Sequence, residues 1–144
     1  MIRTVAATSA ALSVLGACLS APSAAAAEGD QTISVQNGQI RCLLSSNYQD
    51  LGRPMAICGR SDGGTFAVSR PPLNLAAVRA TGEMFFAAGT IPGPESADVV
   101  LGTGQTYGVN GWTVTTQDLR TLITYDDGGH GMRVNPVEAR AVWV

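Results

Sequence analysis

Turn residues recur so often along this 144-residue chain that they restrict its regular elements to short strands. The clearest turn signals are Asn37-Gly38, Asp62-Gly63-Gly64, Asn110-Gly111 and Asp126-Asp127-Gly128-Gly129. Glycine and asparagine accept the positive φ that tight hairpin turns require. Turn signals spaced about 8–12 residues apart predict an all-β fold, here a small sandwich or barrel of short antiparallel strands.

The runs between these turns alternate polar and apolar residues, as half-buried strands do. Thr32–Gln36 alternates in this way, and Gln39–Leu44 follows the Asn37-Gly38 turn as a second strand. In the last third of the chain, alternation around Asn110-Gly111 places four side chains on one face, namely Tyr107, Val109, Trp112 and Val114. We therefore expect one β domain of hairpin-connected strands.

Three segments and the aromatic residues need separate predictions. Thr65–Val68 is predicted as a strand, whereas the helical spacing within Leu73–Ala80 predicts a turn of helix or a loop. Pro136–Ala139 is predicted as a short helical turn, because proline is favoured at the first helical position. Four aromatic side chains are expected in the core, namely Phe85, Phe86, Trp112 and Trp143.

The first residues have the pattern of an export signal. One positive charge, Arg3, precedes an uncharged run from Val5 to Ala27. Ala24–Ala27 supplies the small-x-small pattern of a cleavage site. The run is too short and too rich in Ala and Ser for a permanent membrane span. We predict a signal peptide over residues 1–27 and a single secreted or extracytoplasmic domain over residues 28–144.

A cysteine within this leader indicates an alternative route. Leu15-Gly16-Ala17-Cys18 resembles a bacterial lipobox, in which Cys18 would be lipidated. Two acyl chains hold a protein stably on a bilayer, so lipidation would anchor the chain to the outer face of the cell membrane. Simple secretion and lipid anchoring both stay open, and a membrane is a partner only if Cys18 is lipidated.

The two other cysteines, Cys42 and Cys58, predict a disulfide. Outside the cytoplasm two remaining thiols usually pair. The bond would close a loop of about 15 residues and stabilise the fold by ~3 kcal/mol in the chain-entropy model. A metal site is not expected, because two cysteines and one histidine supply too few ligands for structural zinc.

Charge and glycine patterns argue against nucleic acid and nucleotide binding. Every basic residue is arginine, and removing Arg3 from the nine leaves eight against eleven acidic residues in the mature part. This balance makes no basic stripe for nucleic acid. Gly102-Thr103-Gly104-Gln105 lacks the lysine and the following helix of a phosphate-binding loop. We expect no cofactor.

His130 is the single histidine and lies between Gly129 and Gly131. The preferred interpretation is a structural turn motif, in which the glycines permit unusual backbone angles and the imidazole hydrogen-bonds a neighbouring strand. The alternative is a general base oriented by Asp126 or Asp127. No nucleophile elbow of the Gly-x-Ser-x-Gly type accompanies the histidine in the sequence.

Four short parts of the chain form a recognisable set, namely Gly38–Cys42, Cys58, Val100–Thr106 and the Gly-His-Gly segment Gly129–Met132. With them, the chain resembles a family of small exported actinobacterial proteins of unknown function. The resemblance covers most of the mature chain and implies an exported all-β domain without adding chemistry. The family often has further cysteines near the positions of Trp112 and Leu122, so packing around Trp112 would replace a second disulfide here.

These observations favour a non-enzymatic cell-envelope or secreted domain that binds an extracellular partner or has a surface-structural role. One alternative is a small hydrolase-like enzyme using His130 with Asp126 or Asp127. Another is a secreted inhibitor that presents Ser45–Pro54 or Gly89–Ala97, because binding residues are common on loops held by a rigid scaffold.

Overall fold

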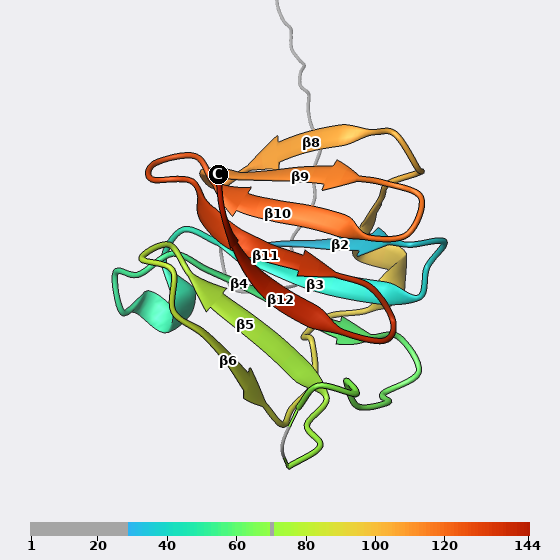
Figure 1. Cartoon of the computed structure of the whole chain (residues 1–144). Coiled ribbons are helices and arrows are strands. Elements are labelled where there is room, and N and C mark those ends of the chain that lie inside the picture. The colour runs from blue at the N-terminus through green and yellow to red at the C-terminus, as the bar shows by residue number, and fades with distance from the viewer. Residues whose placement is uncertain (1–28, 70) are drawn as a thin grey trace, which may run out of the picture.

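The computed structural model describes residues 29–69 and 71–144, which form two β-sheets packed face to face (Figure 1). The predicted signal peptide, residues 1–27, and Cys18 within it lie outside the described residues. Within the described part, no helix is long and apolar enough to cross a membrane. The prediction of an all-β fold of short, mainly antiparallel strands is confirmed, and the architecture is a two-layer sandwich.

The first half of the domain forms a six-stranded sheet in the order β6-β5-β4-β3-β2-β7. Strands β2 to β6 pair antiparallel with their neighbours in sequence, whereas β7 pairs parallel with β2 at the edge. Two short 3₁₀ helices lie in its loops. The bounds are β2 Gln31–Val35, β3 Ile40–Ser45, η2 Tyr48–Asp50, β4 Met55–Arg60, β5 Leu75–Arg79, β6 Met84–Ala87, η3 Glu95–Ala97 and β7 Val99–Val100.

The second half forms a five-stranded antiparallel meander in the order β12-β11-β10-β9-β8. Each strand is followed directly by its neighbour in the sheet, so short turns are sufficient to connect them. The bounds are β8 Thr106–Val109, β9 Trp112–Thr116, β10 Thr121–Tyr125, β11 His130–Val134 and β12 Ala139–Trp143.

The main core fills the space between the sheets with alternate side chains from both layers. Trp112 is fully buried there, and its indole Nε1 donates a hydrogen bond to the carbonyl oxygen of Ser45 at 3.0 Å. Ser45 ends β3, so this bond joins the two sheets and satisfies the one polar atom of the ring. The predicted common face of Tyr107, Val109, Trp112 and Val114 is confirmed by their cross-strand pairing.

The predicted disulfide is confirmed between Cys42 on β3 and Cys58 on β4. The two residues are direct cross-strand partners with their Cα atoms 4.1 Å apart, and both are fully buried. The bond therefore links the two central strands of the six-stranded sheet from within the core.

Three local predictions were wrong. Leu73–Ala80 contains a strand, β5, because neighbouring strands and buried faces on both sides of the sheet override its weak helical spacing. Thr65–Val68 forms no strand, although Phe66 enters the core. Pro136–Ala139 forms no helical turn, since the side chain of Asn135 accepts hydrogen bonds from the next two free N–H groups and β12 begins at Ala139.

Candidate functional site

The outer face of the six-stranded sheet carries a second apolar cluster, on the side opposite the main core. Its side chains come from β3, β4 and β5 and point away from the five-stranded sheet, because neighbouring residues of a strand face opposite sides. Two loops cover the cluster and contribute Tyr48 and Ile91 to it. The members on the strands are Leu43, Met55, Ile57, Leu75 and Ala77.

A groove of about 360 Å³ lies between these loops and over the cluster. We call it the apolar groove. Leu43, Ile57 and Leu75 line it from the sheet. The loops add Tyr48, Gln49, Thr90, Ile91 and Pro92, and Asp30 also lines the groove. The two segments expected from the sequence to present binding residues, Ser45–Pro54 and Gly89–Ala97, therefore face each other across one groove.

A buried ion pair holds the second of these loops against the sheet. Arg41 on β3 donates from Nε and Nη2 to the two carboxylate oxygens of Asp98, at 2.7 and 2.8 Å. Both side chains are nearly inaccessible, with 9% and 1% exposed. The hydrogen bond to Asp98 raises the pKa of Arg41 above its already high usual value. Further bonds to the carbonyls of Ile91 and Gly93 make Arg41 the anchor of the groove wall.

The first loop is shaped by its own backbone and by Asn47. The amide of Tyr48 donates to the carbonyl of Arg53 at 2.9 Å, and the amide of Gly52 donates to the side chain of Asn47. Gln49 and Asp50 both have positive φ, which is uncommon for residues with a side chain. The loop therefore folds back on itself and turns the Tyr48 ring toward the sheet.

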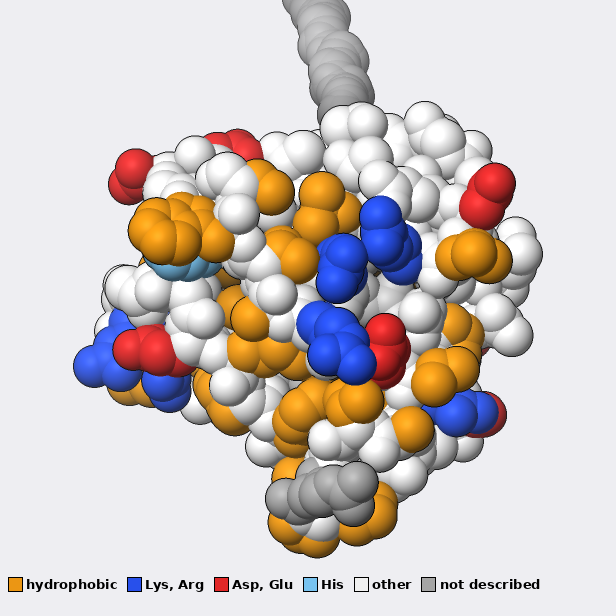
Figure 2. Space-filling model, viewed as in Figure 1, with side chains coloured by type: hydrophobic (Ala, Val, Ile, Leu, Met, Phe, Trp, Pro, Cys, Tyr) orange, Lys and Arg blue, Asp and Glu red, His pale blue; other side chains and the backbone are white. Residues whose placement is uncertain are grey.

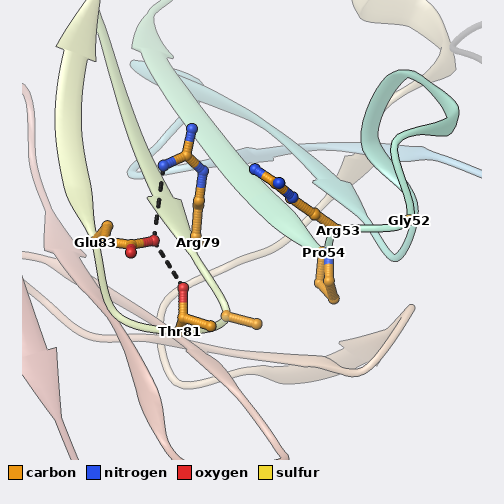
Figure 3. Close-up of a pocket in the computed structure, with 7 residues that line it drawn as sticks. Gly52, Arg53, Pro54, Arg79, Thr81 and Glu83 are labelled. Carbon is orange, nitrogen blue, oxygen red and sulfur yellow. Dashed lines mark hydrogen bonds and ion pairs between the residues drawn. The ribbon is translucent and has the colours of Figure 1, made fainter.

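At the end of the same face lies a second cavity, of about 440 Å³, which we call the arginine cleft (Figure 3). Its walls are the segment before β4, Gly52–Pro54, and the β5–β6 hairpin, Arg79–Glu83. The side chain of Arg53 extends toward that of Arg79, which lies between Arg53 and Glu83 (Figure 3).

The charges of the arginine cleft are only partly neutralised. Glu83 accepts a hydrogen bond from the hydroxyl of Thr81 at 2.7 Å and lies 3.6 Å from Nη1 of Arg79. The Thr81 hydrogen bond is the main cause that lowers the pKa of Glu83, and the positive charges of Arg79 and Arg53 add to it. Among the described residues, no carboxylate lies within 4.0 Å of the Arg53 guanidinium.

The guanidinium group of Arg79 packs on an aromatic ring, and one of its hydrogen-bond donors has no partner among the described residues. Its guanidinium carbon lies 5.0 Å from the centre of the Phe85 ring, a cation–π arrangement. Its Nε is buried and has no hydrogen-bond partner among the described residues. A buried unpaired donor costs stability, so this atom is a local cost within the fold of the cleft wall.

His130 lies away from the groove, at the start of β11 rather than in the turn before it. Its ring stacks on Trp143, with the ring centres 4.7 Å apart and the planes inclined by 22°. Asp126 accepts a hydrogen bond from Thr113 instead of orienting the imidazole, and Asp127 is exposed. Among the described residues, no hydrogen bond joins His130 to either carboxylate.

Close backbone contacts require glycine on both sides of His130. A Cβ on Gly131 would lie 1.8 Å from the carbonyl oxygen of Ile123, and one on Gly129 would lie 2.0 Å from that of Val144. On its other side, the imidazole packs against Gly82 in the β5–β6 turn. The predicted core position of Trp143 is wrong, since this side chain is 76% exposed and covers the histidine. Figure 2 shows the histidine, in pale blue, beneath hydrophobic side chains.

Sequence reasoning singled out the two loops but missed the arginine cleft. Arg53 falls inside the predicted loop Ser45–Pro54, yet nothing in the sequence connects it with Arg79 or Glu83, which lie on a hairpin more than twenty residues away. Within the described residues, no group of three or more His, Cys, Asp or Glu side chains is placed to hold a metal ion. Comparisons of the chain with protein-family models, with curated proteins and with solved structures found no match.

Proposed function

We propose that this chain is an exported, non-enzymatic domain that binds an amphiphilic anion on the outer face of its six-stranded sheet. The apolar part of the ligand lies in the apolar groove, and its anionic group lies in the arginine cleft. The observation that carries the proposal is the placement of both cavities on one face of the six-stranded sheet, where the loop between β3 and β4 borders each of them.

The two cavities are close enough for one ligand. Pro54 lines the arginine cleft and Ile57 lines the apolar groove. Three residues along a strand span ~10 Å, because each residue advances the chain by about 3.3 Å. Their volumes of about 440 and 360 Å³ lie within the range of small-molecule sites.

The chemistry of the lining also matches an amphiphile. Apolar side chains from the sheet favour a hydrocarbon chain, since its transfer from water is worth about 0.8 kcal/mol for each buried CH₂ group. Arg53, which has no carboxylate close by among the described residues, supplies a charged donor for a carboxylate or phosphate. The side chain of Arg79, which is 36% exposed, supplies a second positive charge.

Export is supported by the leader pattern and by the Cys42–Cys58 disulfide, since such bonds persist in oxidising compartments. We propose secretion, with lipid anchoring through Cys18 as the alternative, and membership in the family of small exported actinobacterial proteins that the sequence resembles. A binding role without catalysis is supported by the stacking of His130 on Trp143, which occupies the one imidazole of the chain in packing.

A calorimetric titration of the purified protein with dodecanoate tests the proposal. Arg53→Gln should weaken binding about tenfold, equivalent to the ~1.4 kcal/mol that one charge-assisted hydrogen bond contributes. Thr90→Trp should abolish binding, because the indole would fill the groove from an exposed position.

Matched controls make the result specific. Arg120→Gln removes the same charge from the other sheet, and Thr103→Trp adds the same ring at an exposed position away from the groove. Both should bind dodecanoate like the parent. Absence of binding by the parent protein, or equal losses in the test and control variants, would overturn the proposed function.

A further inference from the structure

A second arginine cluster lies on the outer face of the five-stranded sheet, on the opposite side of the sandwich from the apolar groove. Arg133 on β11 and Arg140 on β12 are direct cross-strand partners. Both face outward, because their strand neighbours Val134 and Ala139 point into the core. Arg120, which precedes β10, lines the same small cavity. Figure 2 shows blue side chains gathered over β10, β11 and β12, with a red one beside them.

This cluster has more positive charge than its neighbours neutralise. Arg140 pairs with Glu138 at 3.1 Å, whereas Nε of Arg120 donates to the uncharged amide of Gln117 at 2.8 Å. In the described part of the chain, no carboxylate lies within 4.0 Å of Arg120 or Arg133. The surface therefore holds an excess of two positive charges, although the whole chain carries a net charge of −2.

Such an arrangement is unfavourable for the free protein. Like charges directly opposite each other on adjacent strands destabilise a sheet, and Arg133 and Arg140 are placed in this way. A bound anion would remove this repulsion. The gain would be largest for an anion that contacts both guanidinium groups at once.

The cavity between these side chains has the chemistry of an oxyanion site. It has a volume of about 150 Å³, and Arg120, Arg133 and Arg140 contribute to its lining together with Asn135 and the one carboxylate of Glu138. The planar guanidinium group presents paired N–H donors that match the oxygens of a phosphate. A carboxylate ligand would use fewer of these donors than a phosphate, which presents more oxygens.

We infer that Arg120, Arg133 and Arg140 form a binding site for a phosphate group, separate from the amphiphile site on the other sheet. The phosphate is either free or carried by the headgroup of an anionic lipid, because the recognising chemistry is the same. This inference goes beyond the proposed function and does not depend on it, since no residue is shared by the two sites.

The first experiment titrates the protein with inorganic phosphate at constant ionic strength and follows backbone amide chemical shifts. Shifts of β10, β11 and β12 and their turns should report this site, and any shifts near Arg53 would report the arginine cleft separately. The double variant Arg133→Gln with Arg140→Gln should weaken the apparent affinity at least about tenfold, which corresponds to ~1.4 kcal/mol. Arg60→Gln, which removes one charge from β4 of the other sheet, outside both this cavity and the arginine cleft, should leave the affinity unchanged.

A second arm identifies the source of the phosphate. Vesicles of phosphatidylglycerol and of phosphatidylcholine are mixed with the protein and floated on a density gradient. Cofloatation with phosphatidylglycerol alone, lost in the double variant, assigns the site to a lipid headgroup. Shifts with inorganic phosphate without cofloatation assign it to a soluble phosphate. Either result supports the site.

Melting curves keep the test decisive if a variant folds poorly. Without phosphate, Arg133→Gln should melt at or above the temperature of the parent, because it removes a like-charge contact. Added phosphate should raise the melting temperature of the parent more than that of the variant. No response of the parent to either probe, equal shifts with chloride, or an equal loss in Arg60→Gln would overturn the inference.

Discussion

His130 shows how a residue with catalytic potential is used for packing. Its ring lies between the exposed indole of Trp143 and the backbone of Gly82, so it connects the end of β12 with the β5–β6 turn of the other sheet. The sequence alone indicated that His130 is structural, but it placed the reason in hydrogen bonding. Ring stacking is the reason that the structure provides, and it predicts a different pattern of substitutions.

His130→Ala should lower the free energy of unfolding by about 1 kcal/mol, the contribution typical of an aromatic pair. His130→Phe should stay within about 0.5 kcal/mol of the parent, because it keeps the ring without the nitrogens. Urea denaturation followed by fluorescence measures both. If Phe is as damaging as Ala, a hydrogen bond or a proton of His130 matters and the stacking explanation is wrong.

Thr81 controls the ionisation of Glu83 in the arginine cleft. Since its hydrogen bond is the main cause of the lowered pKa of Glu83, Thr81→Val should raise that pKa toward the ordinary value of about 4.3. The stabilisation from this carboxylate is present above that ordinary pKa and is lost as the pH falls through the lower pKa of the folded state. A carboxyl carbon NMR titration measures the shift, with Thr103→Val as the unaffected control.

At the scale of elements, the buried pair Arg41–Asp98 fixes the loop that forms one wall of the apolar groove. Asp98→Ala should lower the free energy of unfolding by about 3–5 kcal/mol, because Arg41 would remain buried without its partner. Loss of the anchor should also weaken dodecanoate binding. Chemical denaturation and the calorimetric titration measure the two effects.

The matched control is Asp62→Ala, which removes a carboxylate from an exposed pair of similar geometry with Arg60. Solvent screens this pair, so the denaturation midpoint should not move measurably. Equal effects of the two substitutions would show that the Asp98 pair does not hold the loop.

The elements that sequence could predict are those whose turns are local. Asn110-Gly111 has positive φ at both residues and connects β8 with β9 directly, as expected of a two-residue hairpin. Around Asn37-Gly38 the turn is longer, because Gln36 also adopts positive φ, so β2 ends one residue earlier than predicted. Local sequence therefore identified both hairpins but could not fix the length of the second turn.

The elements that sequence missed depend on distant partners. β5 is a strand because β4 and β6 bond to its two edges, and its alanines are buried on both faces, which removes the alternation that would have identified it. The arginine cleft was missed for the same reason, since the register of β4 with β5 brings Arg53 near Arg79. The register in which two strands pair cannot be read from the residues of either strand alone.

At the scale of the whole molecule, the disulfide should account for a large part of the net stability. Reduction should lower the free energy of unfolding by ~3 kcal/mol, since the bond closes a loop of 16 residues. Denaturation with and without reductant measures this difference. Cys18→Ser should behave like the parent. In that variant, two thiols that react in denaturant without reductant would contradict the bond.

The parallel pairing of β7 with β2 has a consequence for the order in which this chain folds. Most neighbours in both sheets are joined by short connections, and such local pairs form quickly. β7 instead joins β2 across more than sixty residues, with Ile33 opposite Val99, so the entropy of closing this long segment must be overcome first. Because a chain is synthesised from its N-terminus, β2 must wait with one edge unpaired until β7 emerges. The six-stranded sheet is thus completed late in folding. Until then the partly folded chain has an unpaired edge on β2, and this intermediate is the form most prone to aggregate.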